Sequence, residues 1–238
     1  MNQASNDTIR DVNIWIALKT VSAFPSTDTQ SNELWRFAKL LEELGFDMSK
    51  WCVSGDPNDP AFTEAGPTNG LIASAAPEAD SLRQAVDIWN GKEGRHGAGF
   101  SSRYALKFRS SFDFRADGFQ TLDSYNVVVS LVERALQIWP GLLVEVCPYH
   151  YSTQKKVFKD RPGVGWMLYL PRRIEIEQVP EARMIHHVKD LNGTEGTILI
   201  SEIDGPFDAD NPEHVKVANA IEIRLADQDL LPRYVDLS

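Results

Sequence analysis

The sequence predicts an α+β fold, with a mixed, largely antiparallel sheet and helices packed on it. Apolar residues alternate with polar ones in several short segments, as in strands, and recur at helical spacing in others. The two kinds of segment are interspersed without the strict strand–helix–strand rhythm of parallel folds. The closing strand segments follow one another through short polar loops, which is typical of antiparallel sheets.

In the first half of the chain, Val12, Ile14, Ile16 and Leu18 share one face of a strand at residues 12–19. Apolar residues at helical spacing predict two helices, each followed by a glycine that can end it. The predicted elements are that strand, a helix over 34–44, a short strand at 50–53, a surface loop at 54–70, a helix over 82–91, and strands at 104–108 and 111–114.

In the second half, an apolar stripe predicts a helix over residues 125–139, which Pro140 and Gly141 end. Strands are predicted at 142–147, 166–170, 184–188 and 196–203. A helix over 212–225 follows, because Pro212 suits a first helical position and Asp210 or Asn211 can cap it. Glu213 then completes a capping box from Asp210.

The chain has 238 residues, of which 42% are hydrophobic, and a mean hydropathy of -0.30. A single domain over residues 1–238 with a full core is therefore expected. No segment approaches the roughly 18 apolar residues of a membrane span, and residues 1–10 lack the pattern of a signal peptide. Cys52 and Cys147 fit reduced core thiols, so we expect a cytoplasmic protein.

The formal net charge is -10, and residues 195–238 carry ten acidic and only three basic side chains. Binding to nucleic acid phosphates needs clustered Lys and Arg, so a nucleic-acid partner is disfavoured. An acidic surface favours a basic protein partner through complementary fields, although it also serves solubility.

The sequence contains no recognised catalytic motif. The acidic run Asp204, Asp208, Asp210 and Glu213 has three readings: a divalent-metal site, helix capping with solvated carboxylates, or contacts to a basic partner. A metal-dependent hydrolase using Asp204, Asp208 and Asp210 is therefore an alternative function. The spacing does not fit an EF-hand.

A glycine-rich loop at residues 91–99 carries Lys92, Arg95 and His96. Such a loop can cradle an anion, or it can simply connect two elements. It matches no known phosphate-binding pattern, which favours the connector.

One ordered set of motifs carries a resemblance to a known family. The motifs are RPGVGWMLYLPR at 161–172, VPEA at 179–182, GTILIS at 196–201, NPEHVKVAN at 211–219, EIRLAD at 222–227 and LLP at 230–232. With them the chain resembles the immunity protein 52 family of bacterial polymorphic toxin systems, over about residues 10–235 and most strongly over 161–232.

The resemblance implies a cytoplasmic antidote without enzymatic activity, cofactor or metal. The expected partner is a secreted nuclease-like toxin, bound directly by an acidic surface, with the antidote itself a monomer or weak homodimer. No nucleic-acid or membrane partner is expected. The residues hypothesised to bind the toxin are Glu202, Asp204, Asp208, Asp210, Glu213, Asp227 and Asp229.

Overall fold

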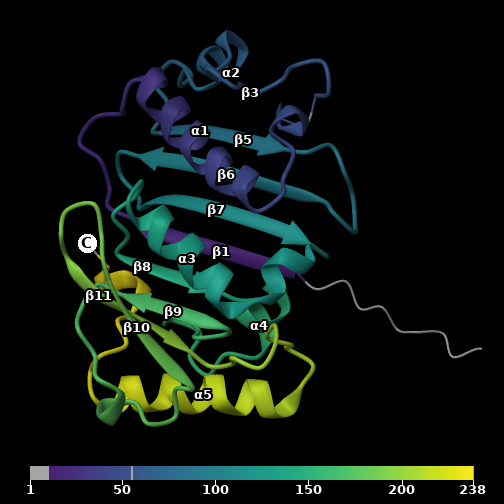
Figure 1. The fold of residues 1–238 in the computed structure, drawn as a ribbon. Coiled ribbons are helices and arrows are strands. Elements are labelled where there is room, and N and C mark those ends of the chain that lie inside the picture. Colours follow the sequence, from purple (N-terminus) through teal and green to yellow (C-terminus); the bar gives the residue numbers. More distant parts are fainter. Residues whose placement is uncertain (1–10, 55, 238) are drawn as a thin grey trace, which may run out of the picture.

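The computed structural model describes residues 11–54 and 56–237, and the prediction for residues 1–10 lies outside them. One nine-stranded sheet runs through the molecule in the order β10-β11-β9-β8-β1-β7-β6-β5-β2 (Figure 1). Neighbouring strands pair antiparallel throughout this order. The strands are β1 Asp11–Leu18, β2 Cys52–Val53, β5 Arg83–Trp89, β6 Ala98–Ala105, β7 Ser110–Asp117, β8 Leu143–Val146, β9 Met167–Leu170, β10 Met184–Lys189 and β11 Glu195–Ile200, with a separate two-stranded sheet of β3 Phe62–Thr63 and β4 Gly66–Pro67.

The helices lie on this sheet, which confirms the α+β prediction. They are α1 Thr27–Glu43, α2 Asn69–Ser74, α3 Tyr125–Leu136, α4 Tyr149–Gln154 and α5 Pro212–Asp227, with short 3₁₀ turns η1 Met48–Lys50, η2 Gln120–Asp123, η3 Ile176–Gln178 and η4 Tyr234–Asp236. Figure 1 shows α1 and α3 lying across one face of the sheet, while α5 runs along the end formed by β9, β10 and β11.

An aromatic cluster fills the space between the sheet and α1. Phe37 of α1 lies 4.6 Å from Phe112 and 5.4 Å from Phe100, measured between ring centroids and with edge-on geometry. Trp139 stacks on Phe112 at 4.0 Å. Rings in such contact add to the stability that their burial already provides. This part of the core therefore consists of one face of the central strands and the apolar stripe of α1, and the core continues under α3 and α5.

The alternation predicted for the first strand is confirmed in β1. Val12, Ile14, Ile16 and Leu18 are all buried on the face that α1 and α3 cover. The interposed residues lie on the opposite face, because successive side chains of a strand point to opposite sides.

The helix predicted over residues 82–91 is wrong, because this segment forms β5. Its buried residues are Gln84, Val86 and Ile88, which recur with the two-residue period of a strand. Because Gln84 is polar, the alternation of buried positions is not visible as an alternation of apolar residues. The spacing of Leu82, Val86 and Trp89 instead resembles one face of a helix.

The helix predicted at 212–225 is α5, but its start differs from the prediction. The cap is Asn211, whose side chain accepts a hydrogen bond from the Glu213 backbone N–H at 3.0 Å. With the cap at Asn211, the third helical residue is His214, so the capping box from Asp210 to Glu213 does not form.

Burial distinguishes several further residues. Trp166 and Tyr169 are 3% and 1% exposed and belong to the core. Cys52 and Cys147 are buried and unpaired. Within residues 11–54 and 56–237, the helices are all too short or too polar to cross a bilayer.

Candidate functional site

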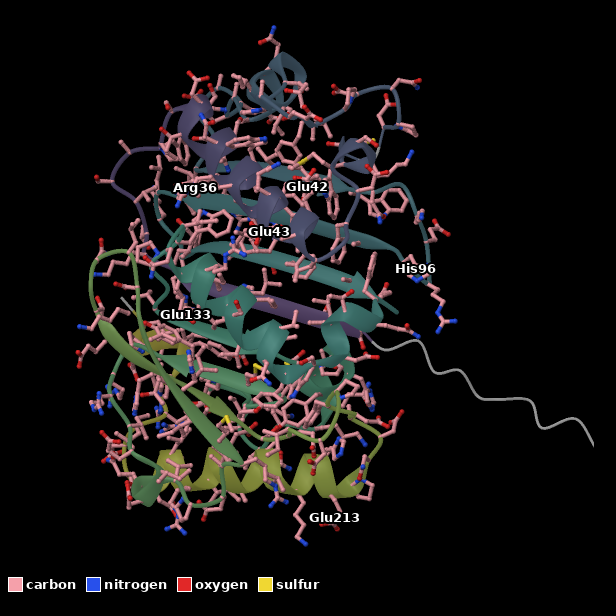
Figure 2. All side chains as sticks on the ribbon, in the orientation of Figure 1. Arg36, Glu42, Glu43, His96, Glu133 and Glu213 are labelled. Atoms are coloured by element: carbon pink, nitrogen blue, oxygen red, sulfur yellow. The ribbon has the colours of Figure 1, made fainter. Side chains whose placement is uncertain are left out.

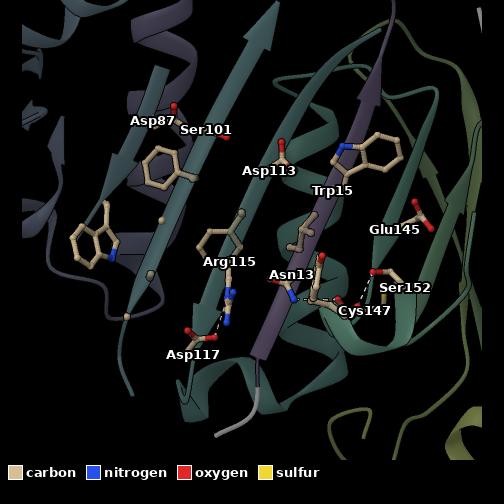
Figure 3. A pocket seen from close by; sticks show the side chains of 18 of the residues that line it. Asn13, Trp15, Asp87, Ser101, Asp113, Arg115, Asp117, Glu145, Cys147 and Ser152 are labelled. Atoms are coloured by element: carbon tan, nitrogen blue, oxygen red, sulfur yellow. Dashed lines mark hydrogen bonds and ion pairs between the residues drawn. The ribbon is translucent and has the colours of Figure 1, made fainter. Parts of the chain in front are cut away.

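The face of the sheet opposite α1 and α3 is only partly covered. Tyr151 of α4 donates a hydrogen bond to the buried Glu222 of α5, and Tyr234 of η4 donates one to the buried Glu145 of β8, so this end is closed. Over β1, β7, β6 and β5 the face is open and forms a groove of about 1080 Å³ (Figure 3). This groove is one candidate functional site, and the acidic residues near α5 are another.

One row of side chains crosses the groove from strand to strand. The antiparallel register aligns Asp87 with Ser101, Ser101 with Asp113, Asp113 with Trp15, and Trp15 with Glu145. Figure 3 shows the five side chains in this order. Neighbouring strands lie about 4.8 Å apart, so the row spans about 19 Å. It brings three carboxylates and one indole into a single line.

Arg103 partly neutralises the row. Its guanidinium lies 2.7 Å from Asp113 Oδ2 and 3.2 Å from Asp87 Oδ1. Burial raises the pKa of Asp113, and the charge of Arg103 opposes this effect. One cation therefore serves two carboxylates, which leaves the row with excess negative charge.

A second row runs beside the first along the groove floor. The register aligns Trp89 with Gly99, Gly99 with Arg115, and Arg115 with Asn13. A side chain at Gly99 would place its Cβ 2.9 Å from the Ile88 carbonyl oxygen. Glycine is therefore the residue that fits between Trp89 and Arg115. Arg115 is paired with Asp117 at 3.2 Å.

Glu145 closes one end of the groove and is only 6% exposed. It accepts hydrogen bonds from the Gly163 backbone N–H at 2.6 Å and from the Tyr234 hydroxyl at 3.0 Å. Lys156 donates to the same hydroxyl at 3.0 Å. Burial raises the pKa of Glu145 to about 7, and the bond from Gly163 and the charge of Lys156 limit the rise.

A second buried carboxylate lies behind the groove. Glu222 of α5 accepts bonds from the Tyr151 hydroxyl at 2.6 Å and from the backbone N–H groups of Val157 and Val164 at 2.7 and 2.9 Å. Burial raises its pKa. Because these donors come from α4 and the following loop, Glu222 anchors both to α5.

The chemistry of this region suits binding better than nucleophilic catalysis. Burial raises the pKa of the Cys147 thiol well above its usual value, so the thiolate is disfavoured. Burial also raises the pKa values of the Tyr151 and Tyr234 phenols. The partly exposed indoles of Trp15 and Trp89 and the carboxylates of Asp87 and Asp113 can instead hold a basic or aromatic side chain of a partner.

The seven acidic residues hypothesised to bind a partner do not form one patch. Glu202, Asp204, Asp208, Asp210 and Glu213 lie at or just before the start of α5, whereas Asp227 and Asp229 lie at its other end. A helix of 16 residues is about 24 Å long. The first group is called the α5-start cluster, and Asp227 and Asp229 lie outside it.

Within the α5-start cluster, the carboxylates differ in what they contact. Glu202 lies 3.2 Å from His214 Nε2 and accepts the backbone N–H groups of Ile203 and Asp204. Asp208 accepts the backbone N–H of Asp210. Asp210 and Glu213 are about three-quarters exposed. Most of this cluster therefore faces solvent.

The alternative hydrolase site gains no support from this geometry. Among residues 11–54 and 56–237, no three His, Cys, Asp or Glu side chains are placed to hold a metal ion together. Asp204, Asp208 and Asp210 are included in that finding.

The groove was missed from the sequence, although a signal was present. In β7 the residues on the groove side are Ser111, Asp113, Arg115 and Asp117, between Phe112, Phe114 and Ala116 on the core side. This alternation predicts a strand with one polar face. It does not predict which other strands place their polar residues beside it.

The fold described above is shared with a solved bacterial protein. No protein-family model matches the chain, and no curated protein sequence matches it. The solved chain is described as Pseudomonas aeruginosa T6SS protein PA0821. The similarity covers 90% of this chain and 72% of that one, with a TM-score of 0.55 and 10% sequence identity. At this identity the likeness concerns the fold alone.

Proposed function

We propose that the protein is an immunity protein, an antitoxin that binds and neutralises a cognate type VI secretion toxin in the cytoplasm. The observation that carries the proposal is the fold likeness, over 90% of the chain, to a protein described as a T6SS protein. The resemblance to the immunity protein 52 family supports the same conclusion. Within that family the chain resembles TsiT, the immunity partner of the nuclease-like effector TseT.

The proposed toxin is a nuclease of the restriction-endonuclease-like class. Such an enzyme must bind nucleic acid phosphates and therefore carries basic residues around its cleft. A net charge of -10 and an exposed acidic cluster suit that partner, because opposite fields accelerate encounter and disfavour wrong partners. In this proposal the protein acts by direct contact and catalyses no reaction.

The α5-start cluster is the proposed contact surface. Asp204 and Asp208 form no ion pair with a Lys or Arg among the described residues, so a partner can use both carboxylates. The family motif itself is mostly scaffold, since Trp166, Tyr169 and Ile198 are buried.

The test is co-expression of this chain with a candidate secreted toxin encoded by a neighbouring gene. We expect a one-to-one complex that survives size-exclusion chromatography and restores growth of the toxin-expressing cells. Absence of both the complex and the protection would overturn the proposed function.

Charge reversal tests the contact surface separately. Asp204→Lys with Asp208→Lys is expected to slow association and to weaken binding at least about tenfold. The matched control is Glu64→Lys with Glu78→Lys, which changes the charge equally at two exposed positions on other elements. Equal weakening in both variants would show a general charge effect and exclude this cluster as the contact.

A further inference from the structure

A second hollow lies at the end of the sheet where three turns meet. It has a volume of about 530 Å³ and is bordered by the turn after α1, the β5–β6 loop and the turn after β7. Figure 2 shows His96 on this side of the molecule, away from Glu213 at the start of α5. The β5–β6 loop is the glycine-rich segment for which the sequence allowed an anion site.

Basic side chains gather around this hollow in an otherwise acidic protein. Lys50, Lys92, Arg95 and His96 line it, and Asp47 is the carboxylate among its lining residues. Asp47 already accepts hydrogen bonds from the Ser49 backbone N–H and hydroxyl, at 2.9 and 2.7 Å. Lys50 and Lys92 form no ion pair with any residue that the structure describes. The hydrogen bonds from Ser49 lower the pKa of Asp47, and the charges of Lys50 and Lys92 add to this effect. Neither ammonium group is fixed in an ion pair, so both can also contact a ligand.

One wall of the hollow is aromatic. Phe119 stacks on Phe46, with ring centroids 4.1 Å apart and planes 22° apart, and His96 meets Phe119 edge-on at 5.3 Å. Trp51 also lines the hollow and is 1% exposed. Its indole Nε1 has no hydrogen-bond partner within the described chain, so its partial positive charge is not neutralised.

Two glycines allow the β5–β6 loop to lie close to this wall. Gly118 has a φ of +71°, and a Cβ there would lie 2.9 Å from Cγ of Arg95. Gly97 allows the loop to close, since its Cβ would lie 2.5 Å from the Lys92 carbonyl oxygen. The backbone N–H of His96 donates to the Asp117 carbonyl at 2.6 Å. The loop is thereby fixed in the position that brings Lys92 and His96 to the hollow.

We propose that this hollow binds a phosphate-bearing aromatic small molecule of about nucleotide size. Its phosphate contacts Lys50, Lys92 and His96, and its ring packs on Phe119. Charge-assisted hydrogen bonds from several donors are the usual means of holding a phosphate, and 530 Å³ lies within the roughly 300–1,000 Å³ of small-molecule sites. The proposal is independent of toxin binding and concerns a different surface.

The test uses the isolated protein and four probes: inorganic phosphate, pyrophosphate, adenosine monophosphate and adenosine. In two-dimensional NMR titrations we expect saturable shifts confined to residues 45–51, 90–97 and 118–121. Adenosine monophosphate is expected to bind more tightly than phosphate. Adenosine is expected to bind most weakly, since it lacks the anionic group.

Variants separate a built site from general attraction of anions. Lys50→Gln with Lys92→Gln is expected to weaken adenosine monophosphate at least about tenfold. Lys19→Gln with Lys107→Gln removes the same charge at exposed positions elsewhere and is expected to leave binding unchanged. Phe119→Leu is expected to abolish the preference for adenosine monophosphate over phosphate. Equal loss in the two lysine variants, or shifts spread over the whole surface, overturns the proposal.

Discussion

Replacing Glu145 by glutamine is expected to stabilise the protein at pH 8 and to leave its stability unchanged near pH 4.5. Glutamine has the shape of the protonated side chain and can still accept the bond from Gly163. It cannot ionise, so the cost of burying the charge disappears.

The magnitude follows from the pKa. Burial raises the pKa of Glu145 from 4.5 to about 7, and a one-unit difference corresponds to about 1.4 kcal/mol, so ionisation costs the fold about 3 kcal/mol. Between pH 4.5 and 7 the folded protein keeps a proton that the unfolded chain has released. The stabilisation is therefore complete below about pH 4.5 and is lost as the pH rises through 7.

The assay is urea unfolding of the wild-type protein and of Glu145→Gln, from pH 5 to pH 8. At pH 8 the variant is expected to be about 3 kcal/mol more stable, which corresponds to a Tm higher by about 6–12 °C. The exposed Glu64→Gln is the control and should follow the wild-type curve. Parallel profiles for the wild type and Glu145→Gln would refute the reasoning.

Three further predictions concern stability measured by urea or thermal unfolding. Gly165→Ala is expected to lower the free energy of unfolding by at least about 3 kcal/mol, because φ is +49° and the new Cβ would lie 2.1 Å from Cys147 Cβ. The control is Gly193→Ala, where φ is +77° but the space is open, and it should cost only about 1 kcal/mol. An equal loss in both contradicts the steric argument. Arg103→Met should lower the free energy of unfolding by about 1 kcal/mol, because it leaves Asp113 unpaired in a half-exposed position. Adding Asp113→Asn should recover much of this loss. If it does not, repulsion between the unpaired carboxylates is not the cause. Asn211→Ala should cost about 1 kcal/mol through the lost α5 cap, and Asp210→Ala should cost much less; the reverse order would return the cap to Asp210.

Local patterns were enough to predict most of the elements. The alternation in β1 and the apolar stripe of α3 are each contained in a few consecutive residues. Several elements were missed or misplaced: β6 begins at Ala98 and not at residue 104, α4 was not predicted, and β5 was taken for a helix because the buried Gln84 breaks its apolar alternation. The side-chain oxygen and nitrogen of Gln84 have no hydrogen-bond partner among the described residues. A sequence pattern that expects apolar residues in the core does not predict a glutamine there.

The groove could not be predicted in the same way, because it depends on strand register. Asp87, Asp113 and Glu145 come from three strands, and only pairing across the sheet aligns them with Trp15. The acidic run before α5 was visible because its members are close in sequence. Proximity in sequence favoured that cluster as a candidate, whereas the groove emerges only from long-range pairing.

The central position of β1 has a consequence for synthesis of the protein. Ile14 is made early, yet its neighbours in the sheet are Phe114 and Val146, which emerge about 100 and 130 residues later. At about 5–20 residues per second, the ribosome needs on the order of ten seconds to supply them. During this time β1 has no neighbouring strand to pair with. The nascent chain therefore carries an apolar strand without pairing partners until β7, and then β8, have been made.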